Sequence, residues 1–580
     1  MRLGIRKVSL PSLVALLGTI ALLAAGCGST TPKGPANLAK DQTLTIPINM
    51  TGSADFSSLD PDLCPDTTCA QQDQFIFGGG MFAEDANLNG EKWDAKSYDV
   101  SSDGTVYTIH LKDNLRYSNG DPVNAADYAY SINRSANPCV ASPQSSYVAS
   151  IKDAATFSAE TCTNGVITAA DGQTSPVIQT LIGTSLVAVD AKTLKITLQA
   201  PAAYFTQEMT FPNYYPIQQK LVGSDITSEK WLDQLTQGNT GQGGAGPYYV
   251  SFWDHSTAIK LKANPNWWGY VKNTHPYIQE IDWPFFAGGD TIYAAYQAGQ
   301  YDYAAISPAT LVEPARGDAD FHEQTQLVET YLGINNLVAP FNNADAREAV
   351  CLAINRDQLN TAILKNTVSP LWSAIPKGMP GYLANAHGPD GVTATTGDAA
   401  KAKTHWDAYV ASLNGAPVPT ISLLYNQSTA TRKAFWEGVV AQINQALGTN
   451  VTTTVTTGTA WVKALEKGTY QFGRLGWAAD YPDPQDFLTT MFTTDSSVYA
   501  GQGTADTTPS LHAADSEQDA KKREAAYDAA HQKLLDTSAI CPLYQNKTQF
   551  KIRSHVHGLT QNAETYFGLD SIVNTYITNS

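Results

Sequence analysis

The sequence has few charged residues for its length, and positive charge is the scarcer sign. Lys and Arg number 37 against 54 Asp and Glu, and together they make up 16% of the 580 residues. The formal net charge of −17 argues against nucleic acid or anionic lipid as a partner, because an acidic surface repels both. A chain of this length also exceeds a single core, so two or three domains or lobes are expected.

Long apolar runs are scarce as well. The exception covers residues 13–25, which is too short to cross a bilayer comfortably as a permanent helix. Arg2, Arg6 and Lys7 precede this run, and small residues lead from it to Cys27. Basic residues, an apolar run and then small residues are the order typical of a secretory leader. Removal of this leader leaves 34 of the 37 basic residues against 54 acidic ones, so the mature chain has a net charge near −20.

The small residues before Cys27 resemble a bacterial lipobox, in which the cysteine becomes the lipidated first residue of the mature chain. The resemblance implies a signal peptide over residues 1–26 and a lipidated tether over 27–41. An ordinary secretory peptide with an unrelated cysteine is the alternative. We therefore expect an extracytoplasmic protein that is anchored to the cell membrane as a lipoprotein, through its N-terminal lipid only.

Six cysteines remain beside the lipobox cysteine, and an even number in an oxidising compartment favours disulfides. Four of them enclose two loops and are expected to pair as Cys64 with Cys69 and Cys139 with Cys162. Cys351 and Cys541 are left over, either as a further pair or as buried thiols. A zinc site is the rival interpretation, but the sequence has no Cys-x-x-Cys pair or His cluster to support it, so no metal is expected.

Motifs of catalysis are missing too. There is no G-x-S-x-G elbow, and His322-Glu323 lacks the second His of a zinc protease. Residues 241–246 satisfy G-x-G-x-x-G but run into an expected strand rather than a helix, which argues against a dinucleotide site. We expect no catalytic residue, no cofactor and no enzymatic activity; a surface hydrolase is the remote alternative.

The most informative stretch is residues 98–134, YDVSSDGTVYTIHLKDNLRYSNGDPVNAADYAYSINR. Apolar residues alternate over 105–111, which predicts a half-buried strand. Asn-Gly-Asp-Pro at 119–122 predicts a turn. Asn124 suits a helix N-cap, with Asp127 three residues on to reach back to it.

This stretch closely resembles the signature of the bacterial extracellular solute-binding proteins of the peptide/nickel/oligopeptide type, family 5, which are receptors of ABC importers. Further segments resemble the family's motifs in the family's order, so that the resemblance spans about residues 42 to 575. They are SLDP at 58–61, GAGPYYVSFWDHSTAIKLKANPNWWGY at 244–270, AREAVCLAINRDQL at 346–359 and ICPLYQNKTQFKIRSHVHG at 540–558.

The resemblance implies an α/β, two-lobed periplasmic-binding-protein fold of type II, with an extra subdomain, mixed sheets flanked by helices and a hinge between the lobes. The first lobe would be discontinuous. The implied division is 42–78, 203–316 and 540–580 for lobe 1, 79–202 for its inserted subdomain, and 317–539 for lobe 2.

The best candidate site is GRLGWAADYPDP at 473–484, which resembles the family's G-W-x-A-D-Y-x-x-P segment. The resemblance implies that this backbone pairs with the ligand as an added strand, that Asp480 takes a peptide's α-ammonium, and that Arg474 meets the carboxylate of a short peptide. The remaining implied ligand-binding residues are Trp477, Ala478, Tyr481 and, on a looser match, Trp461. Residues 60–72 should lie at the cleft too.

A structural interpretation of the same residues stays open, in which Trp477 is core and Asp480 a turn cap. Asp480 with its two nearby aspartates could also be taken for a calcium loop, but three carboxylates are fewer ligands than Ca²⁺ usually has. We predict a monomeric peptide receptor that delivers di- or oligopeptides to ABC permease subunits. A nickel chelate, an oligosaccharide or haem is the alternative ligand on the same scaffold.

Overall fold

The computed structural model describes residues 35 and 37–579, apart from 51–54, 57, 65–66, 85–89, 287, 427–428, 497 and 564–566. The predicted signal peptide, Cys27 and most of the tether lie outside the described residues. Within the described part, no helix has both the length and the apolar character needed to cross a membrane.

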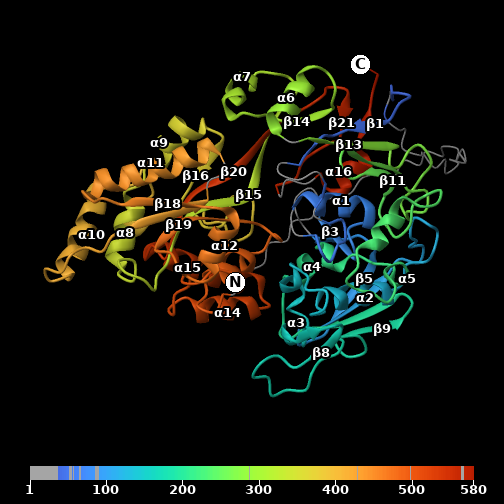
Figure 1. The fold of residues 1–580 in the computed structure, drawn as a ribbon, viewed down its shortest axis with the longest axis horizontal. Helices are drawn as coiled ribbons and strands as arrows, with labels where there is room; N and C mark the ends of the chain where they lie inside the picture. Colours follow the sequence, from blue (N-terminus) through green and yellow to red (C-terminus); the bar gives the residue numbers. More distant parts are fainter. Residues whose placement is uncertain are drawn as a thin grey trace, which may run out of the picture. The chain divides into compact units, whose positions relative to one another are not determined.

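A five-stranded mixed sheet gathers segments from the start and the middle of the chain (Figure 1). The first two strands both run parallel to a strand more than 200 residues later, which pairs antiparallel with the strand on its other side. Helix α1 (Thr67–Phe77) packs Phe75 on Trp283 of this sheet, with ring centroids 5.4 Å apart. The strands are β1 (Thr43–Thr45), β2 (Ile48–Asn49), β11 (Tyr248–Asp254), β12 (Ala258–Ala263) and β13 (Glu280–Phe286).

A four-stranded antiparallel sheet holds the segment with alternating apolar residues. Its strands, in spatial order, are β5 (Ala95–Val100), β6 (Val106–Leu111), β10 (Thr193–Thr197) and β9 (Leu186–Asp190). Tyr107, Ile109 and Leu111 of β6 are buried, as the alternation predicted. Helix α2 (Ala125–Ser135) begins at the predicted N-cap, where the backbone N–H of Asn124 donates to Asp127 Oδ2 at 2.8 Å.

A seven-stranded mixed sheet forms the core of the rest of the chain. Figure 1 shows its two longest strands, β15 and β20, running side by side. In spatial order the strands are β14 (Tyr303–Ala305), β20 (Ile540–Ile552), β15 (Phe321–Ile334), β19 (Phe472–Ala478), β17 (Ser422–Asn426) and β18 (Thr452–Thr456), with β16 (Val368–Pro370) on β20.

Strand β20 belongs to two hydrophobic cores. Cys541 and Leu543, near its start, lie in one core of the seven-stranded sheet, whereas Phe550 and Ile552, near its end, lie in the core of the five-stranded sheet. A strand shared in this way is a direct mechanical link between the two packed regions. The boundary expected at residue 540, between lobe 2 and the last part of lobe 1, falls at the start of β20.

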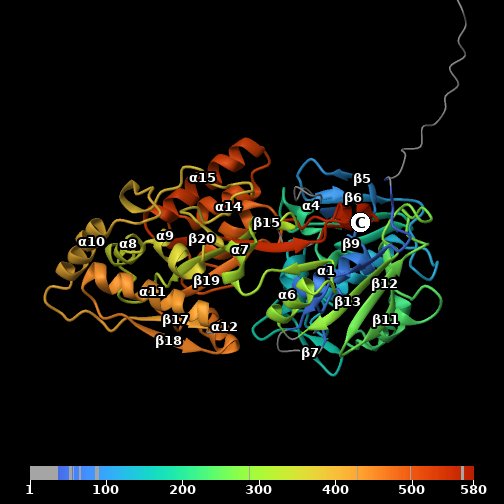
Figure 2. The ribbon, with the colours of Figure 1, turned by 90° about the horizontal axis from the view of Figure 1, so that it is seen from above.

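Helices α8 (Ala344–Leu352), α10 (Ala399–Ser412) and α11 (Ala430–Leu447) share one hydrophobic core with strands of the seven-stranded sheet. Figure 2 shows α8 next to α10. The apolar stripe of α11 faces inward, because Phe435, Val439, Ile443 and Leu447 are all at most 3% exposed. Helix α15 (Ala520–Asp536) precedes strand β20 in the chain.

The remaining elements are short. The two-stranded pairs are β3 (Phe82–Glu84) with β4 (Gly90–Lys92), β7 (Thr161–Thr163) with β8 (Val166–Thr168), and β21 (Val556–His557) with β22 (Tyr576–Ile577). The helices are α3 (Ala154–Ala159), α4 (Phe205–Glu208), α5 (Gln219–Val222), α6 (Gly289–Gln297), α7 (Val312–Ala315), α9 (Arg356–Leu359), α12 (Gly458–Glu466), α13 (Pro484–Phe492), α14 (Thr508–Ser516) and α16 (Leu569–Asn574).

The glycine-rich stretch at 241–246 enters strand β11, not a helix. Its glycines are required by close packing instead. A Cβ on Gly246 would lie 2.4 Å from the carbonyl oxygen of Phe75, and one on Gly244 would lie 2.4 Å from that of Ile76. Larger side chains at Gly244 and Gly246 would clash with the end of α1, which lies against this stretch.

Three disulfides are present among the described residues. They join Cys64 with Cys69, Cys139 with Cys162 and Cys351 with Cys541. The third pair, which the sequence left open, connects α8 to β20 across 190 residues. The buried guanidinium of Arg356 lies beside it, with Nη2 3.6 and 3.5 Å from the two sulfur atoms.

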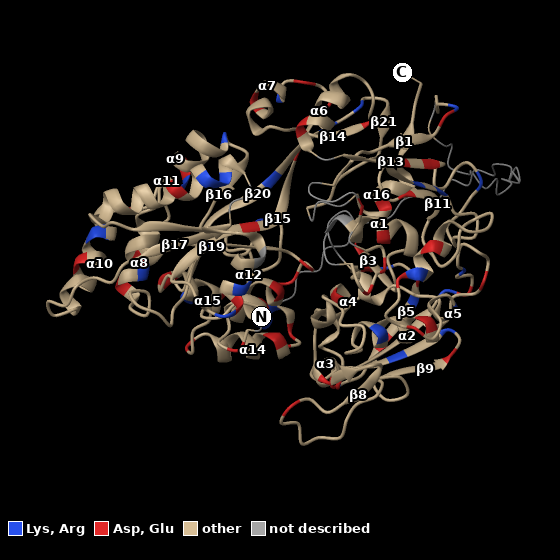
Figure 3. Ribbon diagram, viewed as in Figure 1, with Lys and Arg blue, Asp and Glu red and all other residues tan. Residues whose placement is uncertain are grey.

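Charge is spread along the chain rather than gathered in one element. Figure 3 shows Asp and Glu with Lys and Arg interspersed over the helices and loops. Some of these pairs lie one turn apart on a helix, such as Lys403 with Asp407 and Lys433 with Glu437. Such exposed pairs contribute little to stability, so the fold depends mainly on its cores.

Candidate functional site

A cavity of 620 Å³ is lined by two groups of residues that are far apart in the sequence. One group comes from residues 143–150 and from Tyr204 and Glu208 beside α4; the other comes from the end of β19 and from α13 and α14. The side chains on which the argument depends are Tyr147, Tyr204, Glu208, Trp477, Asp480, Tyr481, Asp486 and His512.

Strand β19 has a free edge next to this cavity. On one side it pairs with β15 along its whole length, from Phe472 to Ala478. On the other side β17 pairs with it only at Phe472 and Gly473. From Arg474 to Ala478, that second edge therefore has no strand partner in the part of the chain that the structure describes, and a further strand could add to it.

Asp480 follows the end of β19 and is half-buried. Its Oδ2 accepts a hydrogen bond from the hydroxyl of Tyr147, and its backbone N–H donates to Asp486 Oδ2 at 3.0 Å. Asp486 is 1% exposed and also accepts from Trp477 Nε1 at 3.1 Å. Asp480 is thus a member of a hydrogen-bonded network that spans both groups of lining residues.

The neighbouring Asp483 has a structural role. Its side chain caps α13 by accepting from the backbone N–H of Gln485 at 2.9 Å. It also forms a bidentate ion pair with Arg523, with both N–O distances 2.7 Å. Asp483 is therefore satisfied by the protein itself, whereas its neighbours Asp480 and Asp486 line the cavity.

Burial makes the carboxyl groups of the cavity hold their protons more tightly than in water. Desolvation raises the pKa values of Asp480 and Asp486, although hydrogen bonds to Tyr147 and Trp477 oppose the shift. Desolvation also raises the pKa of Glu208 to about 8, against a hydrogen bond from Ser150 Oγ. A cation entering the cavity would favour the ionised forms, because an opposite charge lowers a carboxyl pKa.

Three of the predicted site residues line the cavity: Trp477, Asp480 and Tyr481. Ala478 lies at the exposed end of β19. Arg474 and Trp461 are not among the residues that line this cavity, but the structure brings them together, with the Arg474 guanidinium carbon 4.9 Å from the Trp461 ring.

Arg474 is a largely desolvated cation. Nη1 donates to Asn426 Oδ1 at 3.4 Å. Desolvation, reinforced by the nearby positive charge of Arg432, lowers the pKa of Arg474 to about 10, so it stays charged at neutral pH. No carboxylate forms a salt bridge with it among the described residues, which leaves its charge for another partner.

Sequence reasoning missed the lining residues of the other group. Tyr147, Tyr204 and Glu208 lie in segments without a recognisable motif, and nothing in their spacing marks them. Tyr204 stacks on Tyr481 with ring centroids 5.8 Å apart and planes 4° from parallel. His512 of α14 is another lining residue that no sequence signal indicated.

Asp60, expected at the cleft, lies in the interior instead. It is 0% exposed and is held by the guanidinium of Arg134, with both N–O distances 2.7 Å, and by Trp231 Nε1 at 3.1 Å. A carboxylate with three strong donors is fully used in binding its own chain. None of the described residues between 60 and 72 lines the 620 Å³ cavity.

Comparison with known proteins identifies a family. The model of the bacterial extracellular solute-binding proteins, family 5 Middle, matches residues 91–499. The periplasmic oligopeptide-binding protein OppA of Escherichia coli is 28% identical over 585 residues, covering 98% of both chains. The oligopeptide-binding protein OppA of Bacillus subtilis is 26% identical over 484 residues, covering 82% of both.

Solved structures agree on the fold. The Escherichia coli murein tripeptide binding protein MppA superposes with a TM-score of 0.71 at 22% sequence identity, over 94% of this chain and 100% of that one. At this identity the likeness bears on architecture alone. Together with the mixed sheets and helices described above, it confirms the predicted two-lobed α/β fold.

Proposed function

Since the chain belongs to the bacterial extracellular solute-binding proteins of family 5, we propose that it is a receptor that binds di- or oligopeptides and delivers them to ABC permease subunits. Its relatives from Escherichia coli and Bacillus subtilis are named as oligopeptide-binding proteins, which supports a peptide as the ligand. The receptor carries out no chemistry on what it binds.

The free edge of β19 is the observation on which this proposal depends. A peptide in extended conformation adds to that edge between Arg474 and Ala478, where β17 no longer pairs. Main-chain hydrogen bonds of this kind give affinity without selecting side chains, which suits a receptor for many peptides. The 620 Å³ cavity beside the edge leaves room for side chains and water.

Asp480 fixes the register of the added strand by taking the peptide's α-ammonium. Its position just after the end of β19 puts a carboxylate where the added strand would begin or end. A buried carboxylate and an ammonium are natural partners once water is excluded. Tyr147 already donates to Asp480, so the ammonium would share or replace that hydrogen bond.

The other predicted residues have lesser roles in this proposal. Trp477 and Tyr481 form walls of the cavity, and Ala478 offers its backbone to the ligand. Arg474, a buried cation without a carboxylate, would receive the C-terminal carboxylate of a short peptide, and Trp461 beneath it lines a side-chain pocket.

Ligand binding shifts a hinge equilibrium between two lobes, and the permease recognises the closed form. In this proposal lobe 1 comprises 42–78, 203–316 and 540–580 with the inserted subdomain 79–202, and lobe 2 comprises 317–539. The hydrogen bond from Tyr147 to Asp480 and the stacking of Tyr204 on Tyr481 connect these two proposed lobes. The receptor acts as a monomer, held at the outer face of the membrane by lipid on Cys27.

Native mass spectrometry of the protein purified from cells tests the ligand class directly. We expect co-purified masses that fragment as peptides. Titration should also change the emission of Trp477 saturably with mixed di- to pentapeptides, but not with free amino acids or sugars. A response to an oligosaccharide, haem or a nickel chelate, with none to peptides, would replace the peptide by that ligand on the same scaffold.

A further inference from the structure

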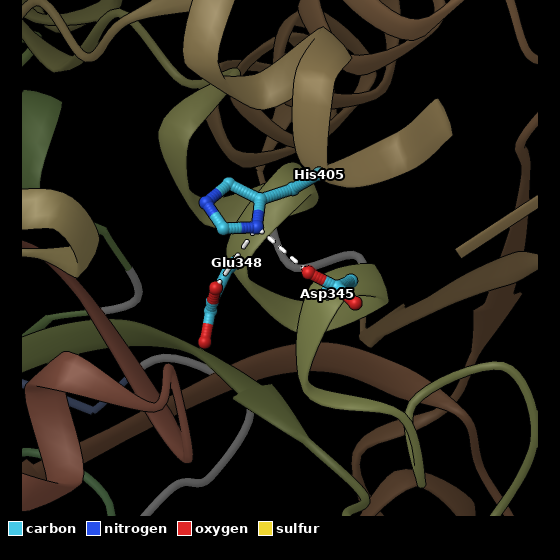
Figure 4. A group of neighbouring side chains, drawn as sticks. All are labelled: Asp345, Glu348 and His405. Carbon is cyan, nitrogen blue, oxygen red and sulfur yellow. Dashed lines mark hydrogen bonds and ion pairs between the residues drawn. The ribbon is translucent and has the colours of Figure 1, made fainter. Parts of the chain in front are cut away.

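We propose that Asp345, Glu348 and His405 form a binding site for a divalent metal ion of the zinc class, between helices α8 and α10 and apart from the peptide cavity. Figure 4 shows both carboxylates directed at the same nitrogen of the imidazole. No sequence motif indicates such a site, because the histidine lies about 60 residues from the two acids.

Helix geometry brings the two acids together. Asp345 and Glu348 lie in the first turns of α8, three residues apart, and residues at that spacing share one face of a helix. His405 lies in the middle of α10, which packs along α8. The site is therefore built on two rigid elements rather than on a loop.

The distances suit a shared cation. Nδ1 of His405 lies 2.9 Å from Asp345 Oδ1 and 3.0 Å from Glu348 Oε2, and the three atoms lie within 4.8 Å of one another. Ligands about 2.1 Å from a tetrahedral zinc ion are about 3.4 Å apart, so the two N–O separations need to open by only about half an ångström. One nitrogen, one or two carboxylate oxygens and water are ligands that Zn²⁺ accepts.

Asp390 supplies the outer support that metal-bound histidines have. Its Oδ2 lies 3.2 Å from His405 Nε2, on the far side of the ring. A metal-ligating histidine typically donates its second N–H to a carboxylate, which fixes the tautomer. A proton on Nε2 directed at Asp390 leaves the lone pair of Nδ1 facing Asp345 and Glu348.

Charge also favours the ion. The groups that face His405 are the carboxylates of Asp345 and Glu348 from α8 and of Asp390 from the 3-10 helix Pro389–Gly391, with Arg347 near Glu348. Three carboxylates around one imidazolium leave two negative charges in excess; a divalent ion on the neutral imidazole leaves one. Binding would release the second imidazole proton to water.

The metal would connect the first turns of α8 to α10, within the lobe that supplies Asp480. None of its three ligands lines the peptide cavity. We therefore expect the ion to stabilise this lobe without changing peptide affinity, so that failure of the metal site and failure of the peptide assignment give different results.

Calorimetry with ZnCl₂ on the untagged, chelator-treated full chain tests the site. We expect one ion per chain and a raised Tm. Glu348→Gln and His405→Gln should each weaken zinc binding at least tenfold, and Asp390→Asn should weaken it 10- to 100-fold, the usual effect of losing an outer partner. His255→Gln is the matched control, because its Nδ1 also meets a carboxylate, that of Asp55.

Peptide titration of the same variants serves as the test of folding, and affinities within about twofold of the wild type are expected. Absence of zinc binding by the wild type up to 100 µM would overturn the proposal. Zinc binding that is unchanged in the Glu348→Gln variant and in the His405→Gln variant would overturn it as well. In either case His405 is an imidazolium held by ion pairs.

Discussion

Arg134 and Asp60 form a bidentate, fully buried ion pair. Nη1 donates to Oδ1 and Nη2 to Oδ2, both at 2.7 Å, and the two side chains are 1% and 0% exposed. Nη1 also donates to Asp62 Oδ2 at 2.8 Å. The pair joins the last turn of α2 to the segment just before α1, and so connects two regions with separate hydrophobic cores.

Removing the cation should be strongly destabilising. Arg134→Met leaves two buried carboxyl groups without their counter-charge, and we expect a loss of about 3–5 kcal/mol in the free energy of unfolding. Urea denaturation of the purified variant measures it. Lys96→Met is the matched control, since its pair with Asp113 is exposed and should cost less than about 1 kcal/mol. Equal losses in both variants would contradict the role assigned to burial.

Asp480→Asn should weaken peptide binding by about 2–5 kcal/mol, or roughly 30- to several thousand-fold, because the peptide's ammonium would be buried without a counter-charge. Calorimetry with a short peptide measures the change. N-acetylated peptides should bind the wild type poorly, and the variant should distinguish acetylated from free peptides much less. Arg474→Ala should affect only peptides short enough to place a carboxylate there.

A control for this prediction is Asp495→Asn. Asp495 also lines the cavity, but its side chain is 64% exposed and is paired with His512. We expect its replacement to change peptide affinity less than threefold. If Asp480→Asn behaves in the same way while remaining folded, Asp480 is a turn residue and the proposed ammonium site is lost.

Stability should depend on pH through Glu208. Its pKa is raised to about 8 in the folded protein, so folding disfavours the ionised form. The loss of folding free energy that this shift causes is absent below about pH 4.5, grows as the pH rises, and reaches its full size above pH 8. Glu208→Gln should therefore match the wild type near pH 4.5 and exceed it by roughly 2–4 kcal/mol at pH 9. A stability difference that does not vary between these pH values would refute the assignment.

The disulfide between Cys351 and Cys541 should contribute to stability. Replacing both cysteines by alanine frees a long loop in the unfolded chain and should cost about 2–4 kcal/mol, measured by thermal unfolding. Peptide mapping without reductant should recover this pair together with Cys64–Cys69 and Cys139–Cys162. Alkylated free thiols at these positions in the native protein would exclude the bonds.

Cys27→Ser should abolish the proposed anchor. Without a thiol at that position no diacylglyceryl group can be attached, so labelling with a radioactive fatty acid should disappear and the protein should leave the membrane fraction. The wild type and Cys351→Ala, whose cysteine lies far from the leader, should both remain labelled. Persistence of label and membrane association in Cys27→Ser would show that the lipobox interpretation is wrong.

Local structure could be predicted from the sequence because neighbouring residues determine it. The alternation in β6 and the cap formed by Asn124 and Asp127 each depend on contacts within a few residues. The order of motifs also identified the family, and with it the two-lobed fold. Of the candidate site, this reasoning located the segment around Asp480, because that segment resembles a family motif.

Only the tertiary structure decided which distant side chains meet. Tyr147 donates to Asp480 across 333 positions, and Cys351 bonds to Cys541 across 190. Arg134 takes Asp60 into the interior, although the two motifs gave no indication that they touch. Such contacts depend on the path of the whole chain, and burial then sets their charge states. No local pattern encodes either, so one of the two groups of residues that line the cavity could not be foreseen.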